Sequence, residues 1–310
     1  MKLLIANLVL FATSSLLAQQ APNMPMTSVP DFLKFPSNIQ MGEAAGVAVN
    51  SKGHVFVFNR GQHPLMEFDA KGNFIRSIDE GLYGFVFPHF VRVDADDNIW
   101  AIDGGSGVVI KMDPNGKVLM LLGRRPEPSE AGQPIPLSNE LFNRPTDVAF
   151  DAAGDIFVAD GYGNSRIVKY DKNGKFVKTW GQRGVRPGEF NLPHSIAIDS
   201  NGLVYVADRE NYRIQIFDTD GKFIKQWNDL GSPWTLCLTQ GPKQTLYVAD
   251  GYQNRLFKVD LDGNILGAYG ETGRQLGQFI NTHGLSCNAD GELFVAETRN
   301  WRVQKLVPKK

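Results

Sequence analysis

The sequence predicts an all-β fold, a six-bladed β-propeller, because one short strand motif occurs six times along 310 residues. The copies read HVFVFN, NIWAID, DIFVAD, LVYVAD, TLYVAD and ELFVAE, and they end at Asn59, Asp103, Asp160, Asp208, Asp250 and Glu297. Successive copies end 42 to 57 residues apart, which suits a unit of four short strands. Six such units indicate six blades around a central channel.

Each copy has the same order of elements. A first strand such as VRVD or IAID precedes the motif, and a turn that usually carries glycine separates the two. The third strand usually opens with arginine, and tight Asn-Gly or Asp-Gly turns lead to the fourth. This signature resembles the NHL repeat. The recurring arginines are predicted to form a structural ion pair or hydrogen bond, and they are Arg166, Arg213, Arg255 and Arg302.

The last copy ends at Lys310 after its third strand, so its edge is open unless another segment supplies a fourth strand. We expect the N-terminal segment DFLKFP, Asp31 to Pro36, to close that blade after a short linker over 19–30. The propeller then forms a single domain over 31–310. A Pro-rich insertion from Arg124 to Pro145 separates blades 2 and 3, and both a lid and a passive surface loop are consistent with it.

The N-terminus predicts export. Lys2, an apolar run from Leu3 to about Ala12, and Ala18 at the cleavage position form a signal peptide over 1–18, typical of a secreted or periplasmic protein without a membrane anchor after cleavage. The formal charge of -1 provides no positive surface for nucleic acid. We expect a monomer. Cys237 and Cys287 are too few for a disulfide framework and are predicted to be buried apolar residues.

Three of the five histidines share one repeat position. His89, His194 and His283 each lie 14 residues before the strand-end residue of their copy, in blades 2, 4 and 6. The same position in the other blades holds Ala45, Thr146 and Trp234. Because alternate blades stand about 120° apart and the first strand lines the channel, three imidazoles should converge on the axis. This is the ligand set of a catalytic zinc with an open position, and three separate core histidines are the alternative.

Strand parity places the loop after each motif on the same face as the histidines. These loops contain Arg60, Tyr162 and Arg209, and Tyr252 occupies an equivalent segment of blade 5. Two arginines beside a metal favour an anionic substrate such as a carboxylate, since arginine pairs with it bidentately. A tyrosine next to a metal and an arginine can act as a base.

Several segments resemble, in order, the peptidyl-α-hydroxyglycine α-amidating lyase family. The most specific are DGYGNSRI, LPHS and ADRENYRI, within a resemblance that covers roughly half the chain. The resemblance implies a six-bladed propeller whose zinc is held by His89, His194 and His283. It further implies Tyr162 as the base, Arg60 and Arg209 as substrate-binding residues, and cleavage of a peptidyl-hydroxyglycine C–N bond to give an amide and glyoxylate. Tyr252 lies outside the match and serves as an internal control.

The chain departs from that family at three positions. Gly284 stands where the family has an aspartate that serves a structural calcium, so a calcium site is doubtful. Asn281 stands where the family has methionine, and Gly163 replaces a cysteine. A non-catalytic NHL-type propeller that binds a peptide or glycan on the histidine face is the alternative, because this architecture is a common interaction platform and fold does not fix function. A calcium-dependent lactonase-like site would need carboxylates and amides, where this sequence has imidazoles.

Overall fold

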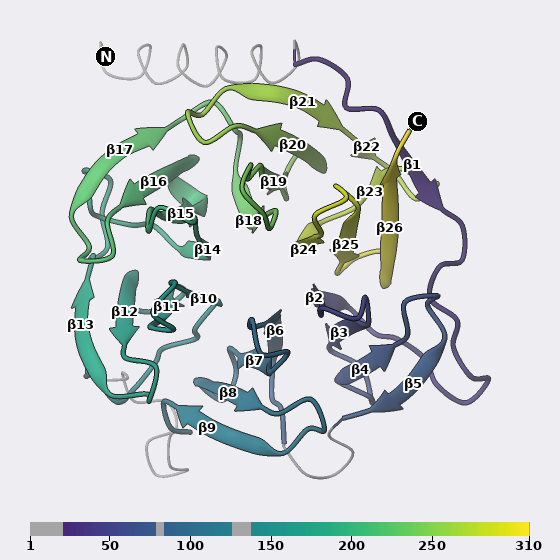
Figure 1. Cartoon of the computed structure of the whole chain (residues 1–310), viewed down its shortest axis with the longest axis horizontal. Coiled ribbons are helices and arrows are strands. Elements are labelled where there is room, and N and C mark those ends of the chain that lie inside the picture. Colours follow the sequence, from purple (N-terminus) through teal and green to yellow (C-terminus); the bar gives the residue numbers. More distant parts are fainter. Residues whose placement is uncertain (1–20, 79–83, 126–137, 310) are drawn as a thin grey trace, which may run out of the picture.

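The computed structural model describes residues 21–78, 84–125 and 138–309, and it confirms the six-bladed propeller (Figure 1). Each blade is a four-stranded antiparallel sheet, and in blades 1 to 5 the strands follow chain order from the channel outward. Among the described residues no helix is long and apolar enough to cross a membrane.

Blade 1 comprises β2 (Ala44–Val49), β3 (Val55–Asn59), β4 (Leu65–Phe68) and β5 (Phe74–Ser77). Blade 2 comprises β6 (Pro88–Val93), β7 (Ile99–Asp103), β8 (Val108–Met112) and β9 (Val118–Leu122). Blade 3 comprises β10 (Asp147–Phe150), β11 (Ile156–Asp160), β12 (Arg166–Tyr170) and β13 (Phe176–Trp180). Blades 4 and 5 comprise β14 (Pro193–Ile198), β15 (Val204–Asp208), β16 (Arg213–Phe217) and β17 (Phe223–Trp227); and β18 (Pro233–Leu238), β19 (Leu246–Asp250), β20 (Arg255–Val259) and β21 (Ile265–Tyr269). Blade 6 comprises β24 (Thr282–Cys287), β25 (Leu293–Glu297), β26 (Arg302–Pro308) and β1 (Met26–Val29). A 3-10 turn, η2 (Arg209–Asn211), follows β15, and β22 (Glu271–Thr272) pairs with β23 (Gln278–Phe279).

The hydrophobic core lies between neighbouring blades. The second strand of every blade is buried at all of its residues, because adjacent blades cover both of its faces. Between blades 2 and 3, for example, Trp100 and Ile102 pack in one cluster with Val158 and Val168. The outer strand β13 instead alternates between half-buried and exposed residues. Continuous apolar motifs in the sequence thus mark the middle of each blade.

The predicted role of the recurring arginines is confirmed in three blades. Arg166 pairs with Asp160 at 2.9 Å, Arg213 with Asp208 at 2.7 Å, and Arg302 with Glu297 at 2.6 Å. Each arginine also donates to backbone carbonyls of the loop that enters its blade, such as those of Ser138 and Leu141. These ion pairs therefore fix the end of the second strand, next to the loops on the histidine face.

The N-terminal segment closes blade 6, but not with the residues expected. Met26–Val29 pairs antiparallel with β26, and Met26 lies opposite Pro308, whereas 31–36 does not supply the strand (Figure 1). The left-handed Asp31 turns the chain, after which Phe32 packs against Phe294 and Phe35 against Phe68. The domain therefore includes part of the expected 19–30 linker. Phe32 and Phe35 instead fill the gap between blades 6 and 1.

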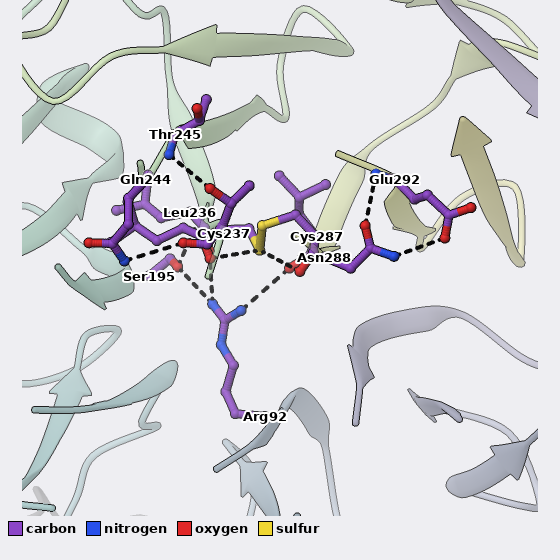
Figure 2. The surroundings of a disulfide bond; sticks show 12 residues. Arg92, Ser195, Leu236, Cys237, Gln244, Thr245, Cys287, Asn288 and Glu292 are labelled. Atoms are coloured by element: carbon purple, nitrogen blue, oxygen red, sulfur yellow. Dashed lines mark hydrogen bonds between the residues drawn. A yellow bond between two sulfur atoms is a disulfide. The ribbon is translucent and has the colours of Figure 1, made fainter. Parts of the chain in front are cut away.

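The cysteines form a disulfide, which corrects the prediction that they are free apolar residues. Cys237 on β18 and Cys287 on β24 are bonded, and their Cα atoms are 6.0 Å apart (Figure 2). The two strands are neighbours at the channel, although 50 residues separate the cysteines in the chain. Sequence spacing carried no signal of this pairing. The predicted signal peptide, 1–18, and residues 126–137 of the insertion lie outside the described residues.

Candidate metal centre

The three histidines lie at matching irregularities of the innermost strands. The pairing of β6 with β7 shifts register between Pro88 and Phe90, so His89 is the extra residue; β14 and β24 shift in the same way around His194 and His283. A β-bulge of this kind redirects a side chain out of the regular alternation. Proline before His89 and His194 suits this break, because proline cannot donate to the ladder. The bulges turn the imidazoles toward one another at the centre of the channel.

The histidine side chains form a nearly equilateral triangle. Ring centroids are 4.8 Å apart for His89 and His194, 4.7 Å for His89 and His283, and 5.0 Å for His194 and His283. One ring nitrogen from each lies within 4.8 Å of the others, and all three residues are buried. The structure thus brings together the residues that the repeat position singled out.

Backbone carbonyls fix the orientation of each imidazole. Nδ1 of His89 lies 2.7 Å from the carbonyl oxygen of Thr146, Nδ1 of His194 lies 2.7 Å from that of Trp234, and Nδ1 of His283 lies 2.8 Å from that of Ala45. These acceptors are the residues at the histidine position in the next blade around the ring. Because a carbonyl can only accept, each Nδ1 carries hydrogen and each Nε2 keeps its lone pair. This is the arrangement of metal-binding histidines.

The surroundings also keep the histidines uncharged. Burial, and then the neighbouring His283, lowers the pKa of His89 well below its ordinary value; burial and then Arg209 does the same for His194. Burial, and then Arg60, lowers the pKa of His283 to about 3. Neutral imidazole is the form that binds a metal, so the triad is ready to bind without losing a proton at pH 7.

Tyr162 lies directly beside this triangle. Its hydroxyl oxygen is 3.3 Å from Nε2 of His89 and 3.4 Å from Nε2 of His194. A phenol has one hydrogen, so it can donate to only one of these nitrogens at a time. Arg144 and Arg209 approach the tyrosine ring, with guanidinium carbons 4.5 Å and 5.7 Å from its centroid. The tyrosine oxygen therefore faces the ligand atoms in a positively charged setting.

The two predicted arginines stand on different sides of the channel, each with a carboxylate partner. Arg60 donates to Glu43 at 2.9 Å and to the carbonyl oxygen of Pro88 at 3.1 Å, and it lies 3.8 Å above the Phe87 ring. Arg209, in η2, contacts Glu210 at 2.8 Å. Both side chains are mostly buried, so a carboxylate beside them would meet a cation with little competing water.

Sequence reasoning missed two residues of this site. Trp234 appeared only as the blade 5 residue at the histidine position, yet its ring lies 5.4 Å from His194 and 4.4 Å from the Arg209 guanidinium carbon. Arg144 precedes Thr146 by two residues and has a left-handed backbone, as do Leu192 and Asn281 two residues before their histidines. The three residues share this backbone conformation but no residue type, so the sequence carried no signal for Arg144. Tyr252 donates to Glu210 at 2.9 Å, so it is no neutral control for Tyr162.

The residues present do not fit the calcium site of the resembled family. A side chain at position 284 would place its Cβ 2.8 Å from the carbonyl oxygen of Ala45 and 3.0 Å from Cα of Gly46, so a carboxylate there requires the backbone to move. The histidine triad offers only nitrogen ligands, whereas calcium takes oxygen. Its three neutral imidazoles instead suit zinc or a similar transition metal.

Comparisons with known proteins agree with this architecture. The NHL repeat matches residues 142–170 and 190–217. The chain is 36% identical over 207 residues to rat peptidylglycine alpha-amidating monooxygenase, a match that covers 56% of this chain and 20% of that protein. It is 29% identical to a probable peptidyl-alpha-hydroxyglycine alpha-amidating lyase of Caenorhabditis elegans, covering 88% of this chain and 84% of that protein.

Two further comparisons widen the range of related proteins. Human NHL repeat-containing protein 3 is 31% identical, with 84% of this chain and 78% of that protein covered. A streptogramin B lyase structure superimposes with a TM-score of 0.63 at 15% identity, covering 93% of this chain and 98% of the other, which shows the shared fold alone. The chain spans about a fifth of the length of the rat protein, so the activity of that whole protein does not carry over.

Proposed function

Because the chain belongs to the NHL-repeat propeller family that includes NHL repeat-containing protein 3 and peptidyl-α-hydroxyglycine α-amidating lyases, we propose that it is an exported, zinc-dependent carbon–nitrogen lyase. The proposed substrate is a peptidyl-α-hydroxyglycine or a similar N-acylated α-hydroxyglycine. The observation that carries this proposal is the convergence of three neutral imidazoles beside the Tyr162 hydroxyl. His89, His194 and His283 would hold the zinc, and a zinc ion supplies Lewis acidity toward the substrate's hydroxyl.

The residues around the triad have the positions that this reaction needs. Tyr162, once its own proton has left to solvent, is the base that takes the proton from the hydroxyl, because its oxygen faces the point on which the histidines converge. The bond between the α-carbon and nitrogen then breaks, the electron pair goes to nitrogen, and that proton ends on the departing amide. The hydroxyl carbon becomes the aldehyde of glyoxylate, so the reaction needs no oxidant or added water.

Arg60 and Arg209 hold and polarise the carboxylate and hydroxyl of the substrate. Each guanidinium is held by a neighbouring carboxylate before substrate arrives, so little rearrangement is needed on binding. As negative charge develops on the hydroxyl oxygen, cations already fixed in a poorly hydrated site stabilise it more than mobile water would. Glu43 and Glu210 act here as positioning residues for the arginines.

The disulfide supports export as part of this proposal. Cys237–Cys287 joins two strands at the channel, and such bonds persist chiefly in extracellular or periplasmic compartments. Retention of the bond in protein recovered from the periplasm or culture medium, together with an N-terminus near Gln19, tests this. A protein found only in the cytoplasm with reduced cysteines would contradict it.

A glyoxylate-release assay on α-hydroxyhippurate tests the activity, with zinc content measured on the same sample. We expect glyoxylate and benzamide in equal amounts and about one zinc per chain. The likeness to NHL repeat-containing protein 3, whose name states no activity, favours a second candidate, a non-catalytic propeller that binds a peptide or glycan on the same face. Zinc-loaded protein without any turnover would support that alternative.

A further inference from the structure

Aromatic side chains extend outward from the metal centre along the boundary between blades 4 and 5. Starting at His283, ring centroids are separated by 5.7 Å to Trp234, 5.3 Å from Trp234 to Tyr252, and 6.3 Å from Tyr252 to Tyr212. We define Trp234, Tyr252 and Tyr212 as the aromatic wall. Trp234 is buried, whereas Tyr252 is 49% and Tyr212 is 37% exposed. The wall thus connects the histidines to solvent.

The backbone is adapted to hold these rings. A Cβ at position 251 would lie 2.2 Å from the Trp234 ring, so only glycine before Tyr252 leaves room for the indole. Tyr212 has the left-handed conformation, with φ 54°, at the end of η2. Ser165, Asn254 and Trp301 have the same conformation at this turn in blades 3, 5 and 6, so the repeat itself sets the backbone there. Two large exposed rings that continue from a buried tryptophan beside a candidate metal centre point to a role in binding.

The wall lies opposite Arg60 across the channel. Arg60 follows β3 of blade 1 and donates to Pro88 of blade 2, so it stands between blades 1 and 2. Tyr252 follows β19 of blade 5 and donates to Glu210 of blade 4. In a ring of six blades these two boundaries face each other, as the positions of β2, β6, β14 and β18 around the channel show (Figure 1).

This placement matches the shape of the proposed substrate, on whose identity the argument rests. The α-carbon carries a hydroxyl, a carboxylate and an acylated nitrogen, which point in divergent directions. With the carboxylate toward Arg60 and the hydroxyl toward the histidines and Arg209, the acyl group points across the axis, past Arg209, toward Trp234 and the boundary of blades 4 and 5. We propose that the aromatic wall binds this acyl group and makes the protein selective for an apolar or aromatic acyl substituent.

The selectivity is measured as the ratio of the kcat/KM values for two substrates. We expect wild-type kcat/KM to be higher for α-hydroxyhippurate, which carries a benzoyl group, than for N-acetyl-α-hydroxyglycine. In the variant Tyr212→Asn/Tyr252→Ser this ratio should fall by about tenfold, because contacts with two rings are lost. Asparagine tolerates the left-handed backbone at 212, so the fold is preserved. An unchanged ratio in this variant overturns the proposal.

Two single variants separate the ring contact from other effects. Tyr252→Phe keeps the ring but removes the hydrogen bond to Glu210, which holds Arg209. It should change kcat/KM for both substrates by the same factor and leave the ratio intact. Trp301→Asn is the matched control, since Trp301 is 60% exposed, left-handed, and the blade 6 equivalent of Tyr212. If Trp301→Asn lowers the ratio and the tyrosine variant does not, the acyl group lies over blade 6.

A binding measurement tests the wall independently of turnover. Hippurate and N-acetylglycine lack the hydroxyl and cannot be cleaved, so their affinities for zinc-loaded protein can be compared by calorimetry. We expect hippurate to bind about tenfold more tightly, and the double tyrosine variant to lose the difference. Equal affinities for hippurate and N-acetylglycine would overturn the proposal that the aromatic wall binds the acyl group. Selective binding of hippurate without any glyoxylate release would contradict the proposed lyase activity but would still support binding of the acyl group by the aromatic wall.

Discussion

The central channel contains two layers of polar side chains on the same innermost strands, the three histidines and the network around Arg92. The two layers differ in how far the protein satisfies their hydrogen bonds. In the histidine layer, three Nε2 atoms face one another, and the Tyr162 hydroxyl is the partner found for two of them. One layer further along β6, Arg92 bonds to Asp147 at 2.8 Å and 2.6 Å and to the carbonyl oxygens of Leu236 and Leu285 at 3.2 Å and 3.4 Å.

In the Arg92 layer, groups of the protein itself thus satisfy the hydrogen-bonding capacity of the guanidinium. Ser195 donates to Asp147 at 2.6 Å and lies 3.3 Å from the arginine, so blades 2 to 6 all contribute to one network. Figure 2 shows Arg92 reaching Ser195 and Leu236 next to the Cys237–Cys287 disulfide. Three acceptors that face each other with a single phenol to share prepare a site for an ion, whereas a mostly buried guanidinium surrounded by acceptors fills its site permanently. We therefore expect the histidine layer to govern activity and the Arg92 layer to govern stability.

The largest expected effect is the loss of zinc from the histidine layer. Replacing His89, His194 and His283 together with alanine should reduce the zinc content from about one per chain to none, because no other described residues form such a ligand cluster. Elemental analysis of the purified variant measures this. His54→Ala is the control, since His54 pairs with Glu67 away from the channel. Zinc retained by the triple variant would show that the triad is not the metal site.

Tyr162→Phe should lower turnover by about 10² to 10⁴ while zinc content stays at the wild-type level. The ring remains beside the histidines, but the oxygen that takes the proton is gone. Steady-state glyoxylate release measures the change. Tyr269→Phe, on the outer strand β21, is the control and should keep wild-type turnover. Turnover equal to wild type in Tyr162→Phe would remove this residue from the mechanism.

In the second layer, Arg92→Met should lower the free energy of unfolding by about 3–5 kcal/mol, because it leaves the fully buried Asp147 carboxylate without its cation. Urea unfolding measures the loss. Arg92→Met/Asp147→Asn should regain part of it, since no charge is then left unpaired. If Arg92→Met stays as stable as wild type yet loses zinc, the division of roles between the layers is wrong.

The disulfide next to Arg92 should contribute less to the free energy of unfolding than the ion pair of Arg92 with Asp147 does. Cys237→Ala/Cys287→Ala is expected to cost about 2–4 kcal/mol in the free energy of unfolding, because the unfolded chain is no longer constrained by a closed loop. Denaturant unfolding without reductant measures it. Zinc content and turnover of the folded variant should match wild type, and a selective loss of zinc would tie the disulfide to the histidine layer instead.

The smallest expected effect concerns the arginines. Arg60→Ala and Arg209→Ala should each lower kcat/KM by about 10- to 100-fold, since a hydrogen bond to a charged group is lost. Both kcat and KM should change, because the carboxylate is held from ground state to transition state. Arg186→Ala is the control, since Arg186 is exposed and pairs with Glu189. An effect no larger than this control would exclude the arginines from substrate binding.

Local repetition made the architecture predictable. Buried second strands and tight glycine turns are short-range features that recur from blade to blade, and the arginine that opens the third strand recurs in blades 3 to 6. The histidine position was found the same way, because a ring of equal blades turns equal sequence positions into equal distances from the axis. The predicted closing strand was wrong because 31–36 is not the one unassigned segment: Phe32 and Phe35 pack between blades, whereas Met26–Val29 pairs with the last strand.

The sequence by itself determined the blade number, the strand order and the three histidines that meet at the channel. Only the tertiary structure decided what lies between blades: the Cys237–Cys287 bond, the Arg92 network and the position of Trp234 beside Arg209. The cysteines lie at different repeat positions, three residues after Trp234 and four after His283, so periodicity could not pair them. Contacts across a ring depend on how neighbouring strands approach at the axis, and no local pattern in the chain encodes that approach.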